Sequence, residues 1–326
     1  MAVGIMSADE PITCCVLGNG TMGAQIALSL ALGGAVVNLW GRRPGGLPES
    51  KERCREGYEF LVGERLADPE DAEAVLARIG LQGDLDTAVS EADFIIEAVA
   101  EDLAIKTELL ARAEKLAGED AILSSTTSAL SASDIQAGLA NPGRFCVAHY
   151  AQPAHLVGLV EVVPGRRTEP EVTDAVIRIL SETGKTPVLC PDIPGFLWAR
   201  IQHAVLREFV TLVGQGLVTP EACDTVLKQG YASRLPAMGA FEHADLAGLD
   251  LLNGNAARAV WADLSNITDP DLTPLGSLFK DGHTGMKSGK GFYDWTNERD
   301  PEAFKQKRDE EIVRRIKIQR GAEVKL

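Results

Sequence analysis

Three glycines near the start of the chain have a spacing that suits the binding of a phosphate group. Gly18, Gly20 and Gly23 form a GxGxxG pattern within the run Gly18–Gly23. The first glycine permits a tight turn, the second lets backbone N–H groups approach a pyrophosphate, and the third lets a helix pack closely on a strand. The turn, which includes Met22, is therefore predicted to bind a dinucleotide at a helix N-terminus. The alternative interpretation is a glycine-rich turn without a ligand.

The residues on both sides of this turn have the pattern of a βαβ unit. Ile12–Leu17 is a short apolar, β-branched run, Ala24–Leu32 has helical apolar spacing, and Ala35–Trp40 has the character of a second strand. The unit has about the thirty residues that a right-handed crossover between parallel strands needs. The strand–turn–helix context makes the glycine pattern more specific than its spacing alone.

The end of the second strand bears on the choice of cofactor. An acidic residue normally stands there and bonds the ribose 2′-hydroxyl of NAD, but the run Asn38–Arg43 has none. A 2′-phosphate would be repelled by a carboxylate and attracted by the guanidinium groups of Arg42 and Arg43. We therefore expect NAD or NADP as the cofactor, with NADP favoured. The alternative is that the two arginines belong to a solvated turn.

The remaining pattern divides the chain into an α/β part and a helical part. Helical spacing in Leu103–Leu116 and Glu171–Thr183 alternates with further apolar strands, and Phe196–Gln215 is again helical with little strand character after it. The strands are expected at Phe94–Val99, Ala121–Ser124, Phe145–Ala148, Leu159–Val163 and Pro187–Leu189. We predict a Rossmann-like, doubly wound domain over residues 1–193 and an all-helical C-terminal domain over residues 194–326.

Composition narrows the classes of function. The net charge of −15 over 326 residues disfavours nucleic acid, which needs clustered Lys and Arg. Polar residues interrupt the apolar run Ala24–Trp40, so a membrane span is not expected, and the first residues lack the pattern of a secretory signal. The chain is expected to be a cytoplasmic protein. The charged tail Asp300–Leu326 has the pattern of a solvated helix.

The cysteines and histidines give no sign of a metal site. The six cysteines show no CxxC or Cys/His ligand spacing, and most fall in apolar stretches. The five histidines are scattered and form no HExxH pattern. We expect reduced, mostly buried cysteines and no bound metal.

Several segments, taken in order, resemble the 3-hydroxyacyl-CoA dehydrogenase family. The resemblance begins with Gly18–Gly23 and continues through Thr126–Ala129, His149–Pro153 and Leu159–Val163. It extends over nearly the whole chain through the segments Pro194–Phe196, Met238–Phe241, Gly248–Asp250 and Lys287–Tyr293. Each segment alone is a weak signal, but their order is specific.

The resemblance implies the roles of the candidate catalytic residues. His149 and Glu161 correspond to the family's catalytic pair, and Ser128 to a serine that contacts both substrate and nicotinamide. The chemistry agrees, because a neutral imidazole can accept the proton of an alcohol, and a carboxylate can fix its tautomer and stabilise the imidazolium. A hydroxyl group can donate to or accept from an oxygen that changes from alcohol to carbonyl. Taken separately, these three side chains could be structural.

The same resemblance implies further cofactor contacts and a dimer. Glu101, Lys106 and Lys287 match positions that contact the cofactor in the family. The helical domain commonly forms a dimer interface in the family, so a homodimer is expected. The resemblance also implies that the active site lies between the domains.

Departures from the family pattern concern the substrate. Ala199 replaces an asparagine that helps to hold the substrate, while Gln152 and Thr126 each replace a usual asparagine. Relatives of similar architecture oxidise small acids, including carnitine, gulonate and pyridine carboxylates. A small carboxylate needs a cation, for which Arg234 is the first candidate and Arg200 the second. Bulky Trp198 could refill the space beside Ala199.

Two hypotheses of different classes follow from these patterns. The first is an NAD(P)-dependent oxidoreductase that acts on a CH–OH group, either of a 3-hydroxyacyl-CoA or of a small hydroxy acid. The second is a nucleotide-binding structural or sensor protein without turnover, which Ala199 would favour. The presence of Ser128, His149 and Glu161 favours the enzyme, because a protein without turnover needs no group that transfers a proton.

Overall fold

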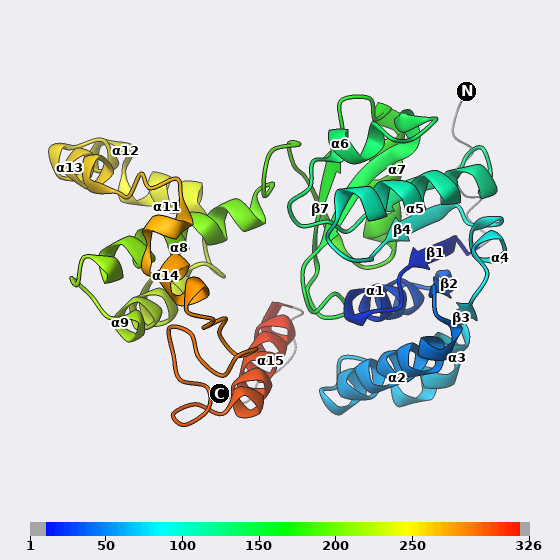
Figure 1. Ribbon diagram of the computed structural model, residues 1–326, viewed down its shortest axis with the longest axis horizontal. Coiled ribbons are helices and arrows are strands. Elements are labelled where there is room, and N and C mark those ends of the chain that lie inside the picture. Colours follow the sequence, from blue (N-terminus) through cyan, green and yellow to red (C-terminus); the bar gives the residue numbers. More distant parts are fainter. Residues whose placement is uncertain (1–10, 320–326) are drawn as a thin grey trace. The chain divides into compact units, whose positions relative to one another are not determined.

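The computed structural model describes residues 11–319 as two compact units, which are considered one at a time (Figure 1). The first unit contains the residues up to Arg200 together with those from Glu310 onward. The second unit is Ile201–Asp309. The predicted boundary near residue 193 stays a prediction.

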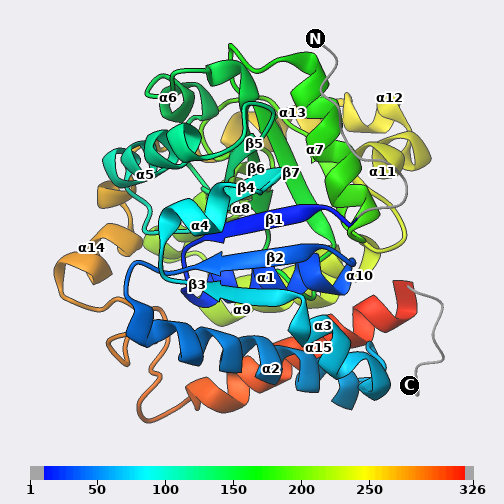
Figure 2. The same cartoon turned by 90° about the vertical axis from the view of Figure 1, so that its right-hand side faces the viewer.

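An eight-stranded sheet forms the centre of the first unit, in the order β3-β2-β1-β4-β5-β6-β7-β8. The strands are β1 (Thr13–Leu17), β2 (Val36–Trp40), β3 (Ile79–Gln82), β4 (Phe94–Glu97), β5 (Ile122–Ser125), β6 (Phe145–Tyr150), β7 (Leu159–Pro164) and β8 (Thr186–Leu189). All neighbouring pairs are parallel except β6 and β7. Figure 2 shows β1, β2 and β3 side by side, and the chain order reverses between β1 and β4. The predicted Rossmann-like, doubly wound domain is confirmed.

Helices cover both faces of this sheet. They are α1 (Thr21–Leu32), α2 (Leu47–Gly63), α3 (Ala72–Ala77), α4 (Leu85–Val89), α5 (Leu103–Leu116), α6 (Ala132–Gln136) and α7 (Pro170–Glu182). Cys14 and Val16 of β1 pack with α1, α2 and α7, whereas Cys15 and Leu17 pack with α4 and α5. Alternate residues of one strand thus serve two cores, as a sheet that is buried on both faces requires.

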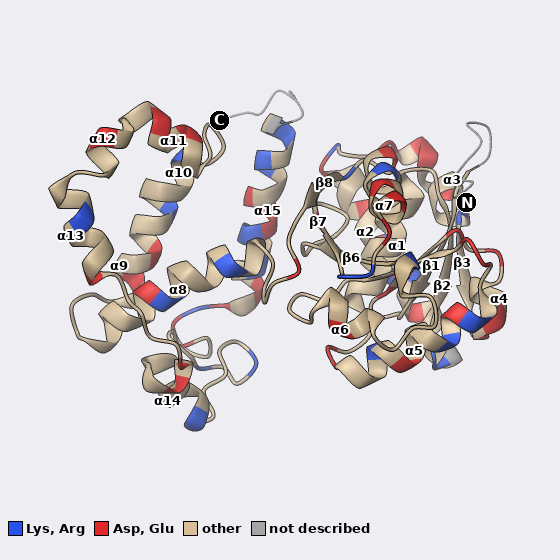
Figure 3. Cartoon of the chain, turned by 90° about the horizontal axis from the view of Figure 1, so that it is seen from above, with Lys and Arg blue, Asp and Glu red and all other residues tan. Residues whose placement is uncertain are grey.

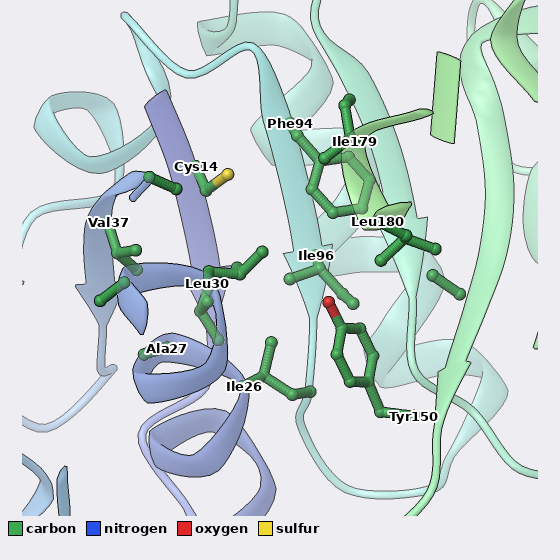
Figure 4. Packing of buried hydrophobic residues seen from close by; sticks show 14 of the residues in the cluster. Cys14, Ile26, Ala27, Leu30, Val37, Phe94, Ile96, Tyr150, Ile179 and Leu180 are labelled. Carbon is green, nitrogen blue, oxygen red and sulfur yellow. The ribbon is translucent and has the colours of Figure 1, made fainter. Parts of the chain in front are cut away.

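The larger core lies around α1 and fixes the helix that follows the glycine turn. Figure 4 shows Ile26 and Leu30 of α1 converging with Ile96 of β4 and with Ile179 and Leu180 of α7. Burial of one such side chain stabilises the fold by roughly 1.5–3 kcal/mol. The start of α1 is therefore held firmly at the carboxyl end of β1.

Strand β3 is the one strand of this sheet that the sequence analysis did not predict. It contains a glycine, Gly80, and lies at the edge of the sheet beside β2. Glycine is depleted in strands, and four residues are too few to show an alternating pattern. The strand conformation of these residues is therefore due to their pairing with β2 and could not be predicted from their own sequence.

The second unit is helical, as predicted, and shows only isolated β-bridges among its described residues. Its helices are α8 (Trp198–Gly214, which begins in the first unit), α9 (Pro220–Thr225), α10 (Ala232–Arg234), α11 (Ala240–Ala247), α12 (Leu249–Leu252), α13 (Asn255–Asp263), α14 (Pro274–Lys280) and the first part of α15 (Pro301–Gln319). A π-helical stretch (Val226–Tyr231) precedes α10. Short 3₁₀ turns occur at Pro44–Gly46, Pro69–Asp71, Pro142–Arg144 and Pro270–Leu272.

The charged tail forms α15, a helix as predicted, but its last part is not fully solvated. In Figure 3 the ribbon of this helix carries both basic and acidic positions along its length. Val313 is only 1% exposed and packs with Leu61 and Leu156, which also belong to the first unit. Lys317 also forms an ion pair with Glu64, with Nζ and Oε2 2.7 Å apart. A few apolar residues in a mostly charged helix can thus form a buried face, which the alternation of charges alone does not predict.

No helix in the described part of the chain is long and apolar enough to cross a bilayer. All six cysteines are buried and free, as predicted. Residues 11–319 contain no cluster of three or more His, Cys, Asp or Glu side chains that could hold a metal ion.

Candidate active site

The glycine turn has the tight geometry that its sequence indicates. Gly18 has a φ of 130°, and a Cβ atom there would lie 2.6 Å from the carbonyl oxygen of Ala98. A Cβ atom at Gly23 would lie 1.7 Å from the carbonyl oxygen of Gly18. A side chain at either position would therefore displace the backbone that leads from β1 into α1.

Gly20 marks the open side of the same turn. It is the N-cap residue of α1, and no side chain caps the helix there. A Cβ atom at Gly20 would meet nothing within 4 Å, and the first turn of α1 contains no acidic residue. Free N–H groups and open space at a helix N-terminus suit an anion, so the turn fits the pyrophosphate of a dinucleotide.

A cavity of about 540 Å³ adjoins this turn within the first unit. It is lined by Gly18, Asn19, Gly20, Trp40, Arg42, Arg43, Val99, Ala100, Ile105, Glu108, Leu109 and Arg112. Both predicted arginines are thus at the cavity, whereas half-buried Met22 packs against the core around α1. The sequence analysis missed Glu108 and Arg112, which share one face of α5 because they are four residues apart.

Lys106 is buried beneath this region and is paired with carboxylates. Its side chain is 1% exposed, and its Nζ lies 2.9 Å from Oε1 of Glu97 and 3.2 Å from Oε2 of Glu101. Glu97 also accepts a hydrogen bond of 2.6 Å from the hydroxyl of Ser125. Burial raises the pKa of Glu97, although Lys106 and these hydrogen bonds act in the opposite direction. The predicted contact of Lys106 with the cofactor stays a prediction.

Glu101 connects this buried group to the loop that carries Ser128. Its Oε1 accepts hydrogen bonds from the hydroxyl of Thr127 and, over 3.1 Å, from the backbone N–H of Ser128. Ser128 is exposed and follows the carboxyl end of β5. The hydroxyl of Thr126, in the same loop, accepts a hydrogen bond of 3.1 Å from the backbone N–H of Tyr150. This bond joins the loop to the end of β6.

His149 and Glu161 form a close pair at the end of the sheet. They lie directly opposite each other in the antiparallel pairing of β6 with β7, with Nδ1 of His149 2.8 Å from Oε2 of Glu161. Both residues are buried, and His149 is 8% exposed. An ionised Glu161 accepts a hydrogen bond from Nδ1–H of His149, which leaves Nε2 of the neutral imidazole as the basic nitrogen. The pair predicted from the sequence is therefore assembled.

The second oxygen of Glu161 is bound by the backbone. Its Oε1 accepts hydrogen bonds from the N–H groups of Leu197 and Trp198, at 2.8 and 2.9 Å, and the Cys190 thiol lies 3.5 Å away. Burial alone would raise the pKa of Glu161, but the hydrogen bonds from His149 and from these two N–H groups outweigh it and lower the pKa. Glu161 thus stays a carboxylate beside His149. These backbone donors left no signal in the sequence.

The other predicted residues lie in the second unit or at the start of α8, just before that unit begins. Trp198 is half-buried at the start of α8. Arg234 is exposed in α10, and Lys287 is exposed in the loop after α14. The substrate contacts of Trp198 and Arg234 and the cofactor contact of Lys287 stay predictions.

Two family models match consecutive parts of the chain. Residues 13–193 match the NAD-binding domain of 3-hydroxyacyl-CoA dehydrogenase, and residues 195–295 match its C-terminal domain. Together they cover most of the chain, including the glycine turn and the pair of His149 with Glu161.

Whole-chain relatives have two kinds of substrate in their names. The 5-formyl-3-hydroxy-2-methylpyridine 4-carboxylate 5-dehydrogenase of Mesorhizobium japonicum is 31% identical over 311 residues, which cover 94% of this chain and 98% of the relative. The human mitochondrial hydroxyacyl-coenzyme A dehydrogenase is 31% identical over 283 residues, 85% of this chain and 89% of the relative. The crystal structure of a 5-dehydrogenase for the same pyridine acid, described as an NAD+ dependent dismutase, has a TM-score of 0.88 and 30% identity and covers 96% of this chain and 100% of its own.

Proposed function

The chain belongs to the 3-hydroxyacyl-CoA dehydrogenase family, and on that premise we propose that it is an NAD-linked dehydrogenase with His149 as its general acid/base. The observation that carries this proposal is the 2.8 Å contact between Nδ1 of His149 and Oε2 of Glu161. It supports an imidazole whose Nε2 is free to take a proton. The non-catalytic alternative has no comparable support, because it does not require this pair.

The proposed mechanism assigns one task to each side chain. His149 takes the hydroxyl proton of the substrate, while Glu161 stays ionised and stabilises the resulting imidazolium. Ser128 hydrogen-bonds the substrate oxygen as it changes from hydroxyl to carbonyl. The turn Gly18–Gly23 would hold NAD, which would supply the acceptor for the hydride from the carbon that bears the hydroxyl group. In the reverse direction His149 returns the proton to the carbonyl oxygen.

We propose that the substrate is a free small carboxylic acid rather than a CoA thioester. The relative from Mesorhizobium acts on a pyridine carboxylate, and its similarity to this chain extends over more of both proteins than that of the human acyl-CoA enzyme. Ala199 replaces the asparagine of the acyl-CoA pattern. Arg234 is the proposed partner of the substrate carboxylate. A hydrated aldehyde also contains the H–C–O–H unit of an alcohol, so His149 could serve in oxidising either.

A substrate panel tests this assignment. NADH formation is measured with small hydroxy acids and with a formylpyridine carboxylate, and NADH consumption with acetoacetyl-CoA. We expect kcat/KM for the preferred free acid to exceed that for acetoacetyl-CoA by at least about 100-fold, because an enzyme discriminates strongly through polar contacts. A preference for acetoacetyl-CoA would assign the chain to the acyl-CoA enzymes instead. No turnover of any member would favour the non-catalytic alternative.

We further propose that Arg42 and Arg43 admit NADP beside NAD. Both are exposed at the cavity next to the glycine turn, and the only carboxylate among the residues that line it is Glu108. Replacing both by alanine should lower kcat/KM for NADP by about tenfold or more, because hydrogen bonds to a charged group are lost, and should change kcat/KM for NAD by less than about twofold. Initial rates with both cofactors provide the measurement.

The control for this pair is Arg55→Ala, which removes an exposed arginine of α2 that is paired with Glu52. This variant should have the same kcat/KM as the wild type with NAD and with NADP. An equal loss with NAD and NADP in the double variant would show that the arginines bind a part common to both cofactors.

We propose that the protein is a homodimer through α11, α12 and α13. These helices contain no buried residue, and they expose Phe241 (89%), Leu246 (74%) and Trp261 (78%). Large apolar side chains that are exposed on neighbouring helices often mark a protein–protein interface. Phe241→Glu combined with Trp261→Glu should convert a dimer into a monomer, as measured by light scattering. Leu116→Glu, on the first unit, should leave the dimer intact. A wild-type protein that is monomeric would contradict the proposal.

A further inference from the structure

The turn that leads into α8 has an unusual backbone. Gly195 has a φ of 75° and Phe196 a φ of 46°, although a bulky residue rarely adopts a positive φ. Phe196 is fully buried, and its N–H donates to the carbonyl oxygen of Ile193 over 3.0 Å. A conformation that a phenylalanine disfavours is thus held in place by its surroundings.

This turn aims two consecutive N–H groups at one carboxylate oxygen. The N–H groups of Leu197 and Trp198 both donate to Oε1 of Glu161, while Oε2 faces His149. Glu161 comes from β7 and caps the N-terminus of α8, which otherwise has unsatisfied N–H donors. The carboxylate is therefore fixed from the side opposite to the imidazole.

The side chain of Phe196 contacts the other member of the pair. The centroids of its ring and of the His149 imidazole are 5.8 Å apart, and the ring planes are inclined by 56°. One residue thus packs against His149 through its side chain and places the donors to Glu161 through its backbone.

We propose that Gly195 and Phe196 are positioning residues, which hold the Leu197 and Trp198 N–H groups on Glu161 and thereby fix the orientation and proton affinity of His149. The inference rests on the proposed function, in which His149 is the base. The two N–H groups share the negative charge of Glu161, so the imidazolium that forms during turnover meets a carboxylate of restrained basicity.

The first test removes one N–H donor and keeps its matched control in the same position. Trp198 is the first residue of α8, where proline is tolerated because its ring suits the helix and its missing N–H has no partner within the helix. Trp198→Pro deletes the donor, and Trp198→Ala removes the side chain but keeps the donor. We expect kcat of the proline variant to be about tenfold below that of the alanine variant, as for the loss of one hydrogen bond to a charged group.

The pH profile separates this role from a general loss of structure. Besides the two N–H groups, the Glu161 carboxylate contacts only His149 of β6 and the Cys190 thiol within residues 11–319. Burial and the nearby Glu161 raise the pKa of Cys190 to about 12. With one donor removed, the carboxylate charge is less dispersed and the pair holds its shared proton more tightly. The acidic limb of the kcat/KM profile should move to higher pH in Trp198→Pro and should not move in Trp198→Ala.

A second pair of variants keeps the test decisive if the proline variant does not fold. Gly195→Ala places a Cβ on a residue with a φ of 75°. Gly184→Ala does the same at a φ of 80° in the turn after α7, where a Cβ meets nothing within 4 Å. Both should lose stability, but only Gly195→Ala should lower kcat and move the acidic limb.

The outcomes distinguish this inference from the proposed function. If Glu161→Gln abolishes turnover while the proline and alanine variants share the same kcat and pH profile, the positioning role is refuted and the base assignment stands. If Glu161→Gln retains full turnover, the role of Glu161 in the proposed mechanism is wrong, and if the wild-type protein turns over no substrate, the proposed function itself is wrong. Cofactor affinity should be unchanged in both Trp198 variants, because neither alters the glycine turn.

Discussion

Replacing His149 by asparagine should lower kcat by about 10³-fold, because a positioned general base contributes 10²–10⁴-fold to such a reaction. Asparagine has a similar volume and can still donate a hydrogen bond to Glu161, so the ends of β6 and β7 should keep their structure. The affinity for NAD should stay within about twofold, since the glycine turn is at the end of β1 and shares no hydrogen bond with His149. Turnover is measured by NADH absorbance and NAD affinity by calorimetry.

The control is His283→Asn, which changes an exposed histidine in the loop after α14. Its kcat should equal that of the wild type. If His149→Asn retained more than about a tenth of the wild-type kcat, His149 would not be the base. If it lost NAD binding as well, the effect would be one of folding, and circular dichroism of the variant would show this.

The cofactor turn could be predicted from the sequence because its determinants are local. Gly18, Gly20 and Gly23 follow a strand and begin a helix, and each has the steric environment that its position in the pattern requires. The pair of His149 with Glu161 could also be predicted, but only through its resemblance to a family. Nothing in the spacing of twelve positions indicates that the two residues face each other across antiparallel strands.

What escaped prediction depends on tertiary contacts or on backbone atoms. The donors to Glu161 are N–H groups of Leu197 and Trp198, and every residue except proline carries such a group. Lys106 lies on a helix that was predicted correctly, but whether its charge meets solvent or Glu97 depends on how α5 packs against β4. The sequence therefore predicts functional side chains better than it predicts contacts made by backbone atoms or set by tertiary packing.

Because Lys106 is buried, replacing it should greatly reduce the free energy of unfolding. Lys106→Met keeps the length of the side chain and removes its charge, so the carboxylate of Glu97, which is 0% exposed, loses its cationic partner. Removal of one partner of a buried pair typically costs about 3–5 kcal/mol. We expect the free energy of unfolding to fall by about that amount at pH 8, as measured by urea denaturation.

The loss should depend on pH in a direction that the pKa of Glu97 sets. Burial already raises this pKa above its usual value of 4.5 in the wild type, and without Lys106 it should rise further. A carboxyl group with a raised pKa in the folded state favours folding while it is protonated, and that advantage is lost as the pH rises through the folded pKa. Lys106→Met should therefore be less destabilising at pH 5 than at pH 8.

The double variant Glu97→Gln with Lys106→Met isolates the charge from the packing. It contains no buried charge at either position, so most of the loss at pH 8 should be recovered. The matched control is Lys317→Met, which breaks the pair with Glu64, whose side chains are 24% and 31% exposed. A pair so accessible to solvent contributes at most about 1 kcal/mol. If Lys106→Met lost no more stability than Lys317→Met, Glu97 would not be a buried carboxylate, and the connection from Lys106 through Glu101 to Ser128 would have no electrostatic basis.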